Sequence, residues 1–294
     1  MLVIDHRREL QRRADAERAA GRRLALVPTM GALHAGHLSL VDEARKRADA
    51  VWVSIFVNPT QFDEAEDFEG YPRELESDLA VCREAGVELV YLPQVEDLYP
   101  PNSQTWVEVS ELTRPLCGAS RPGHFRGVTT VVSKLLLAAK PHVAVFGEKD
   151  FQQLAVIRRM ARDLGFDVEI VGAPTLRESD GLALSSRNVR LGPRARQQAV
   201  ALVRSLDSAE AAATAGERSV AQLLEGVRRE LATASQAEID YAELRDAETL
   251  ELIPDTIAGP TLLALAVNFR SDPDGRGASV RLIDNRVLLR SETE

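Results

Sequence analysis

The sequence predicts an α/β protein in which a doubly wound, Rossmann-like parallel sheet is followed by a smaller α+β domain. Short apolar runs alternate with helical patterns of about a dozen residues through the first part of the chain, which is typical of βαβ units. These runs are apolar throughout, as expected of strands buried on both faces. The pattern changes after "SSRNVRLGP", so we predict domains over residues 1–186 and 187–294.

The first domain opens on an amphipathic helix over residues 6–20, rich in Arg, Glu and Ala. Apolar runs predict strands over 23–29, 50–58, 87–93, 142–147 and 167–175. Helical spacing predicts helices over 36–49, 72–86, 127–140 and 150–165. The stretch "DLYPPNSQ" is typical of a loop, and "TWVEVSEL" (105–112) predicts a further short strand.

The second domain combines helices with a few strands. Residues 193–234 predict two helices, rich in Ala, Arg and Glu and interrupted at "TAGERS". Three short strand-like runs follow, in "AEIDYAELRDAETL", "TLLALAVNFR" and "ASVRLIDNRVLL". This order of elements indicates an α+β fold.

Charge and cysteine usage exclude several classes of partner. The 294 residues carry a formal net charge of -9, which disfavours non-specific binding to nucleic acid or to anionic membranes. The two cysteines, Cys82 and Cys117, indicate reduced thiols rather than a disulfide framework. The charged N-terminus is unlike a signal peptide, and no apolar run reaches the roughly 20 residues of a membrane span. We therefore expect a soluble, cytoplasmic protein.

The segment "PTMGALHAGH" (28–37) places two of the five histidines where the first predicted strand ends and a helix begins. Ligands of doubly wound sheets bind outside the carboxyl ends of the strands. A helix N-terminus offers free N–H groups to an anion, and two imidazoles can donate hydrogen bonds to a phosphate. The alternative is a plain strand–turn–helix junction in which one histidine caps the helix and the other is exposed.

Two further segments carry residues suited to phosphates. In "FGEKDFQQL" (146–154), Lys149 follows a strand and could reach a phosphate, or it could be a solvated charge beside an N-cap, Asp150. In "LRESDGLALSSRN" (176–188), two hydroxyls precede Arg187, which suits a phosphate clamp, although an inter-domain linker is the alternative. Gln153 could turn inward from its helix toward a polar substrate. The segment "FVNPTQF" (56–62) presents Gln61, and alone it indicates only a turn.

Taken together, these segments resemble the pantothenate synthetase (pantoate–beta-alanine ligase) family over essentially the whole chain. The resemblance rests on "PTMGALHAGH", "IFVNPTQF", "YPR", "RPGHFRGV", "FGEKDFQQL" and "DGLALSSRN" in that order. "HAGH" stands where the related class I aminoacyl-tRNA synthetases have a His-x-Gly-His signature. "LSSRN" stands where they have a lysine-bearing phosphate loop. The resemblance implies a nucleotidyltransferase fold of this type and a homodimer paired through the first domain.

The family implies a two-step ligation with ATP and Mg²⁺. Pantoate attacks the α-phosphorus of ATP to give pantoyl adenylate and pyrophosphate, and the amine of beta-alanine then attacks the activated carbonyl, releasing AMP. By resemblance, His37, His34, Lys149 and Arg187 are catalytic, with His37 the usual proton donor, and Gln61 and Gln153 bind pantoate. Gln61 also contacts beta-alanine. The implied ATP-binding residues are Met30, Gly31, Ala32, Leu33, His34, Ala35, Gly36, His37, Gly147, Glu148, Lys149, Asp150, Leu176, Leu184, Ser185, Ser186 and Arg187.

The chain departs from the family in one respect. Some members have adjacent acidic residues and a glutamine, implicated in metal binding, in the helix after "YPR". Here Asp78 remains as the metal-binding candidate, whereas Ser77 and Val81 replace the others. This departure indicates that Mg²⁺ is carried mainly by ATP phosphates and water rather than by the protein.

Two other functions remain open from the residues alone. The first is a different nucleotidyltransferase of the same fold, which would activate a phosphate and need a more cationic pocket than Gln61 and Gln153 provide. The second is a non-catalytic nucleotide-binding regulator, which would not need both histidines, Lys149 and Arg187 together. We also expect the second domain to act as a lid, because acyl adenylates hydrolyse unless water is excluded.

Overall fold

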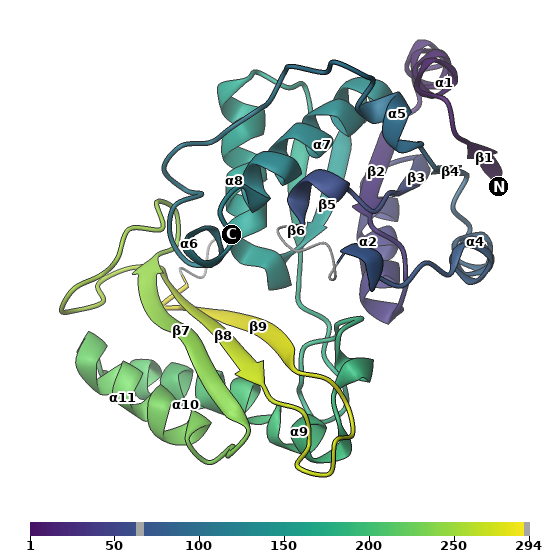
Figure 1. Cartoon of the computed structure of the whole chain (residues 1–294). Coiled ribbons are helices and arrows are strands. Elements are labelled where there is room, and N and C mark those ends of the chain that lie inside the picture. Colours follow the sequence, from purple (N-terminus) through teal and green to yellow (C-terminus); the bar gives the residue numbers. More distant parts are fainter. Residues whose placement is uncertain (63–67, 291–294) are drawn as a thin grey trace. The chain divides into compact units, whose positions relative to one another are not determined.

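The computed structural model describes residues 1–62 and 68–290, and it divides into two compact units, Met1–Pro174 and Thr175–Glu294 (Figure 1). The boundary predicted from the sequence lies between residues 186 and 187. Residues 175–186 instead pack with the second unit.

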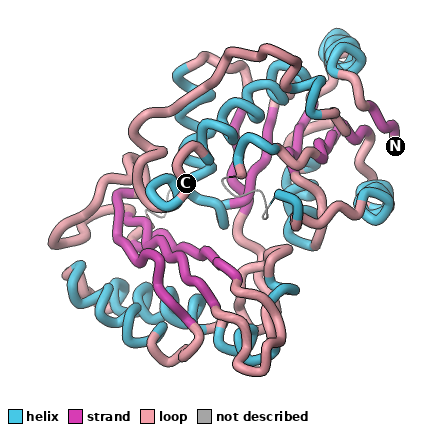
Figure 2. The backbone as a smooth tube through the Cα atoms, in the orientation of Figure 1, coloured by secondary structure: helices cyan, strands magenta, loops and turns pink. Residues whose placement is uncertain are grey.

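The first unit contains a six-stranded parallel sheet in the order β1-β4-β3-β2-β5-β6, which confirms the predicted doubly wound fold (Figure 2). Strand β2 pairs with β3 on one side and with β5 on the other, so the chain order reverses at the β2–β5 junction. The strands are β1 (Leu2–Ile4), β2 (Leu24–Thr29), β3 (Ala50–Ile55), β4 (Leu89–Tyr91), β5 (Val143–Gly147) and β6 (Glu169–Ala173).

Helices cover both faces of this sheet. Alternate strand residues enter two separate cores: Leu24 and Leu26 lie in one with α1, α7 and α8, whereas Ala25 and Val27 lie in the other with α2 and α4. The helices and 3₁₀ turns of the unit are α1 (Arg7–Ala19), α2 (Ala35–Arg45), η1 (Pro59–Gln61), α4 (Leu75–Glu84), α5 (Val95–Leu98), α6 (Cys117–Ser120), α7 (His124–Ala139), η2 (Glu148–Asp150) and α8 (Phe151–Asp163).

In the first unit one predicted strand is absent, and one observed strand was not predicted. Residues 105–112 form no strand; the N–H of Val107 donates to Thr130 Oγ1 at 3.0 Å, and Thr129 Oγ1 donates to the Val107 carbonyl at 2.6 Å. Side chains of α7 thus satisfy backbone groups that a neighbouring strand would otherwise pair. Conversely, the edge strand β1 was not predicted, because its three residues are too few to show a pattern.

The second unit packs helices α10 and α11 on a three-stranded antiparallel sheet, which confirms the predicted α+β fold. Its strands are β7 (Ala237–Asp246), β8 (Thr261–Phe269) and β9 (Val280–Leu288). Its helices are η3 (Asn188–Arg190), α9 (Pro193–Gln198), α10 (Ala201–Thr214) and α11 (Val220–Leu231). The first of the two predicted helices is therefore divided into α9 and α10.

The segment 175–188 packs as part of the second unit and is not an extended linker. Arg177 donates to both carboxylate oxygens of Asp284 at 2.7 and 3.0 Å, and Asp284 is buried in β9. Asn188 Nδ2 donates to Glu178 Oε1 at 2.7 Å, and Arg177 forms an antiparallel bridge with Ala183. These contacts explain why the second unit begins at residue 175, before this segment, and not after it.

No helix within residues 1–62 and 68–290 has both the length and the apolar character that crossing a membrane requires.

Close packing between α7 and η1 gives a stability prediction. A Cβ on Gly127 would lie 2.3 Å from the carbonyl oxygen of Thr60, which is backbone and cannot swing aside. We expect Gly127→Ala to lower the free energy of unfolding by about 1–3 kcal/mol, as overpacking usually does. Gly226→Ala is the matched control, because a Cβ there meets nothing within 4 Å and should stabilise α11 by about 0.5–1 kcal/mol. Thermal unfolding of both variants checks this, and an equally stable Gly127→Ala protein would contradict it.

Candidate active site

The candidate site lies where the strand order reverses, at the carboxyl ends of β2, β3 and β5. Open α/β sheets bind ligands at this point because the loops leaving neighbouring strands diverge there. The His34–His37 turn follows β2, Lys149 follows β5, and Gln61 follows β3. Three of the segments singled out in the sequence therefore leave adjacent strands of one sheet.

His34 and His37 cap the N-terminus of α2 reciprocally. The N–H of Gly36 donates to His34 Nδ1 at 3.1 Å, and the N–H of His34 donates to His37 Nδ1 at 3.2 Å. The two ring centroids are 4.2 Å apart. Because each Nδ1 accepts a hydrogen bond, each neutral ring carries its proton on Nε2. The alternative in which one histidine caps is thus correct for His34, but His37 is half-buried and completes the cap rather than lying exposed.

The surroundings keep both imidazoles neutral. Burial lowers the pKa of His37 from 6.5 to about 3, with smaller contributions from His34 and Lys149, while Asp150 acts in the opposite direction. Burial, followed by the charge of Lys149, also lowers the pKa of His34. Lys149, from the β5 end, therefore acts electrostatically on the histidine pair at the β2 end. Near neutral pH, the pair can therefore donate two Nε2–H hydrogen bonds beside one cation.

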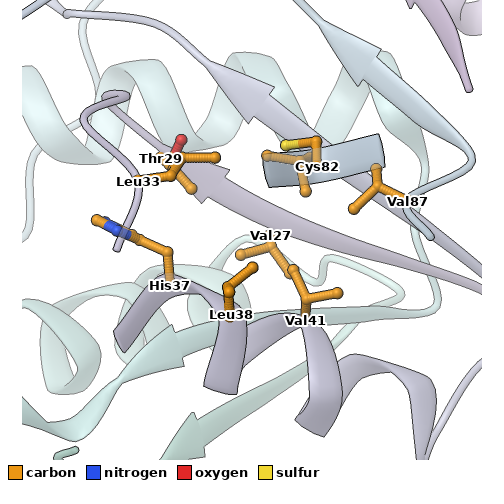
Figure 3. Close-up of a pocket in the computed structure, with 9 residues that line it drawn as sticks. Val27, Thr29, Leu33, His37, Leu38, Val41, Cys82 and Val87 are labelled. Atoms are coloured by element: carbon orange, nitrogen blue, oxygen red, sulfur yellow. The ribbon is translucent and has the colours of Figure 1, made fainter. Parts of the chain in front are cut away.

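His37 also lines an apolar cavity. Figure 3 shows the His37 side chain at the edge of this cavity, among aliphatic side chains of β2 and α2. Burial raises the pKa of the Cys82 thiol, which also lines the cavity, to about 11. The lining residues are Val27, Thr29, Leu33, His37, Leu38, Val41, Val53, Cys82 and Val87.

The N-terminus of α2 does not offer the open row of N–H groups that the sequence predicts. The N–H groups of Ala32 and Leu33 donate to the two carboxylate oxygens of Asp78, at 3.0 and 2.7 Å. Those of His34 and Gly36 are taken by the histidine rings. Anion binding at this edge therefore falls to the Nε2–H groups and to Lys149 more than to the helix backbone.

Asp78 does not fit the metal-binding role that the resemblance implied. Both of its oxygens already accept backbone N–H groups, and the side chain is buried. Among the residues that the structure describes, no group of three or more His, Cys, Asp or Glu side chains could hold a metal ion. The residues present thus provide no site for a resident Mg²⁺ around Asp78.

Gln61 is held in one orientation by its neighbours. Its Oε1 accepts a hydrogen bond from Asn58 Nδ2 at 3.1 Å, so its amide nitrogen faces the other way and contacts Met30 Sδ at 3.1 Å. Asn58 is itself fixed by Tyr99, whose hydroxyl donates to Asn58 Oδ1 at 2.9 Å. The amide donor of Gln61 is therefore directed toward the start of the His34–His37 turn.

The two glutamines of α8 differ in burial. Gln152 is buried and donates to the carbonyls of Leu112 and Pro115, at 2.9 and 2.7 Å, and it accepts from the N–H of Cys117. Gln153 is half-buried in the first turn of α8. Asp150 is the N-cap residue of α8, as the alternative predicts, but its side chain makes no capping hydrogen bond.

Five of the predicted ATP-binding residues belong to the second unit: Leu176, Leu184, Ser185, Ser186 and Arg187. The N–H of Leu184 donates to the Leu176 carbonyl at 2.9 Å, and the N–H of Arg187 donates to Ser185 Oγ at 3.2 Å. Ser186 and Arg187 are half-buried. This closed turn gives the "LSSRN" segment a defined shape within its own unit.

Sequence reasoning missed the residues that position the others. At Asn58 the sequence indicates only a turn, and at Asp78 the resemblance implies a metal ligand. Arg121 and His124 of "RPGHFRGV" donate to the carbonyl of Gln61, at 3.3 and 2.8 Å. The sequence contains no local signal for these contacts, because each partner lies dozens of residues away.

Comparison with known proteins gives a consistent result over the whole chain. Residues 2–287 match the profile of the family described as pantoate-beta-alanine ligase. The pantothenate synthetase of Geobacter sulfurreducens is 54% identical over 288 residues, which cover 98% of this chain and 99% of that one. The crystal structure of pantothenate synthetase from Thermus thermophilus is 45% identical, with a TM-score of 0.87 over 97% of this chain and 99% of that one. The pantoate-beta-alanine ligase of Francisella tularensis, crystallised with beta-gamma ATP and beta-alanine, is 31% identical, with a TM-score of 0.76 over 98% and 97%.

The lowered pKa of His37 gives a pH prediction. The native ring should stay neutral, with its proton on Nε2, from pH 7 to below pH 5, because its folded pKa is about 3. An unfolded histidine takes up a proton near pH 6.5, so the contribution of His37 to stability is present above that pH and is lost as the pH falls toward 3. Ring ¹⁵N chemical shifts measured across this range check the expectation. A His37 midpoint near 6.5 would contradict it.

Proposed function

We propose a two-step mechanism at the carboxyl edge of β2 and β5 for this chain. The chain belongs to the pantoate–beta-alanine ligase family and is the ATP-dependent ligase that joins pantoate to beta-alanine. The observation that carries the mechanism is the pair of neutral histidines beside Lys149 at the reversal of strand order. This arrangement supports nucleotide phosphates as ligands, because it offers two directed hydrogen-bond donors and one cation.

In the first step, a carboxylate oxygen of pantoate attacks the α-phosphorus of ATP. The new P–O bond forms pantoyl adenylate, and the bond to the leaving pyrophosphate breaks. The main obstacle is repulsion between the carboxylate and the phosphates, so positioning and charge neutralisation dominate the catalysis. Lys149 supplies the positive charge, and His34 and His37 donate hydrogen bonds from Nε2. The low pKa of His37 favours hydrogen-bond donation over transfer of a proton from an imidazolium.

In the second step, the amine of beta-alanine attacks the acyl carbonyl of pantoyl adenylate, and AMP leaves. Gln61 and Gln153 bind pantoate, and Gln61 also contacts beta-alanine. The orientation imposed on Gln61 by Asn58 supports this role, because it leaves an N–H donor for a carboxylate or hydroxyl oxygen. A substrate without the matching oxygen would leave polar groups unpaired and would be rejected.

Mg²⁺ enters this mechanism as part of the substrate. Magnesium commonly binds through phosphates and water with few protein ligands, and the engagement of Asp78 by two N–H groups is in keeping with that. When bound, the ion offsets charge on the ATP phosphates.

The second unit serves as a lid in this proposal, with Arg187 and the hydroxyls of Ser185 and Ser186 completing the phosphate contacts. Excluding water would protect the acyl adenylate from hydrolysis. The ion pair between Arg177 and Asp284 supports this role, because it makes the segment move together with its unit.

We further propose a cytoplasmic homodimer paired through the first unit. The segment around Trp106 has the composition of a strand, and this indole is 46% exposed, which supports burial of this segment against a second copy. The two free cysteines, Cys82 and Cys117, are in keeping with a reducing compartment.

The order of the two steps is tested by isotope exchange. We expect exchange of pyrophosphate into ATP that requires pantoate and Mg²⁺ but not beta-alanine, because adenylation precedes formation of the amide. Exchange that required beta-alanine would overturn the two-step mechanism. Exchange without pantoate, driven by a phosphate acceptor, would instead indicate another nucleotidyltransferase, and binding of ATP with no exchange would indicate a regulator.

The role of Lys149 is tested by its removal. We expect Lys149→Ala to fold normally and to slow adenylation at least about 100-fold, the scale observed when a donor to transition-state charge is lost. Lys46→Ala is the control, because this lysine is exposed and pairs with Glu43 beside the C-terminus of α2. Pantoate-dependent exchange rates compare the two, and a Lys149→Ala rate close to that of Lys46→Ala would reduce Lys149 to a solvated surface charge.

A further inference from the structure

We propose that Asp78 is a positioning residue for adenylation, whose carboxylate fixes the turn that aims His34 and His37 at ATP. The inference rests on the proposed function of the histidine pair. Asp78 lies on a separate helix, α4. We assign to it the role of shaping the backbone of residues 30–34, in place of metal binding.

The contact itself is complete and directional. Asp78 Oδ2 accepts from the N–H of Ala32 at 3.0 Å, and Oδ1 accepts from the N–H of Leu33 at 2.7 Å. The side chain is only 3% exposed, so water cannot replace either bond without opening the site. Charge-assisted hydrogen bonds of this kind are about twice as strong as neutral ones.

The turn requires such a contact because its backbone is unusual. Gly31 has φ +86° and Ala32 has φ +50°, so two consecutive residues occupy the left-handed region. For Ala32 that conformation is unfavourable, because its Cβ crowds the following carbonyl oxygen. Successive N–H groups that converge in this way bind an anion. Asp78 is the anion that fills this position.

The position of the histidines depends on the same turn. His34 follows Leu33 directly, and its N–H donates to His37 Nδ1. If the two hydrogen bonds to Asp78 were lost, the residue leading into the cap would be free to rotate, and the cap that sets both ring orientations would move with it. A displacement of about 1 Å at a reacting group can slow catalysis about 100-fold.

The carboxylate of Asp78 is closely packed against the turn at Gly31. A Cβ on Gly31 would lie 2.8 Å from Asp78 Oδ2 and 3.2 Å from Ile55 Cγ2. The turn and the carboxylate therefore fit together only with glycine at residue 31. This close fit provides a second way to disturb the contact, from the side of the turn and with Asp78 retained.

The principal test is Asp78→Asn, assayed by pantoate-dependent exchange of pyrophosphate into ATP. An asparagine can accept only one of the two N–H groups, and its own amide hydrogens face the other. We expect kcat to fall about 100-fold, while KM for ATP changes only a few-fold. Glu76→Gln is the control, because it removes an exposed carboxylate from the same helix and should leave both constants unchanged. Amide hydrogen exchange should accelerate at Ala32 and Leu33 in Asp78→Asn and stay unchanged across the sheet.

A second variant, Gly31→Ala, covers the case in which Asp78→Asn does not fold. It should show the same fall in kcat with Asp78 present. Unchanged kcat in folded Asp78→Asn, or in Gly31→Ala, would overturn the proposal. Recovery of Asp78→Asn activity at high Mg²⁺ would also overturn it, because that result would assign Asp78 to metal binding. Wild-type protein without pantoate-dependent exchange would instead refute the proposed function, so the two failures are distinguishable.

Discussion

The reversal of strand order between β2 and β5 is the constraint on which the rest of the site depends. Parallel pairing places the carboxyl ends of these strands side by side, and the chain then leaves them in opposite directions. The histidine turn and Lys149 are therefore neighbours although more than one hundred residues separate them. Gln61 joins them from β3, the next strand in the sheet.

The chemistry at this junction depends on how its own polar groups are satisfied. Asp78 and the two imidazoles occupy backbone N–H groups that would otherwise bind an anion. The helix N-terminus thus keeps the histidines in position, and the histidines in turn present Nε2–H donors. Neutral donors suit a site that must admit two anionic substrates and release three anionic products, because they do not bind every anion equally strongly.

The amide side chains show the same division of roles. Asn58 and Gln152 are buried and hydrogen-bonded to neighbouring groups, and Asn58 sets the orientation of Gln61, whose amide nitrogen is directed toward Met30. In the second unit, the Arg177–Asp284 ion pair shapes the segment that carries Arg187. Buried Asn58 and buried Asp284 thus each hold a neighbouring polar side chain in place. Positioning residues are therefore expected to be as sensitive to substitution as the residues they position.

The sequence by itself determined the doubly wound fold, the α+β unit and the family, because apolar periodicity and the six ordered motifs are local properties. It also identified the histidine pair and Lys149 as candidates. Only the tertiary structure decided the hydrogen bonding of Asp78, the orientation of Gln61, the neutral state of His37 and the unit to which residues 175–186 belong. Residues 105–112 show the reason: their composition favours a strand, but two threonines of α7 take the place of a strand partner. Hydrogen-bond partners and burial are set by residues distant in the chain, and no local pattern specifies them.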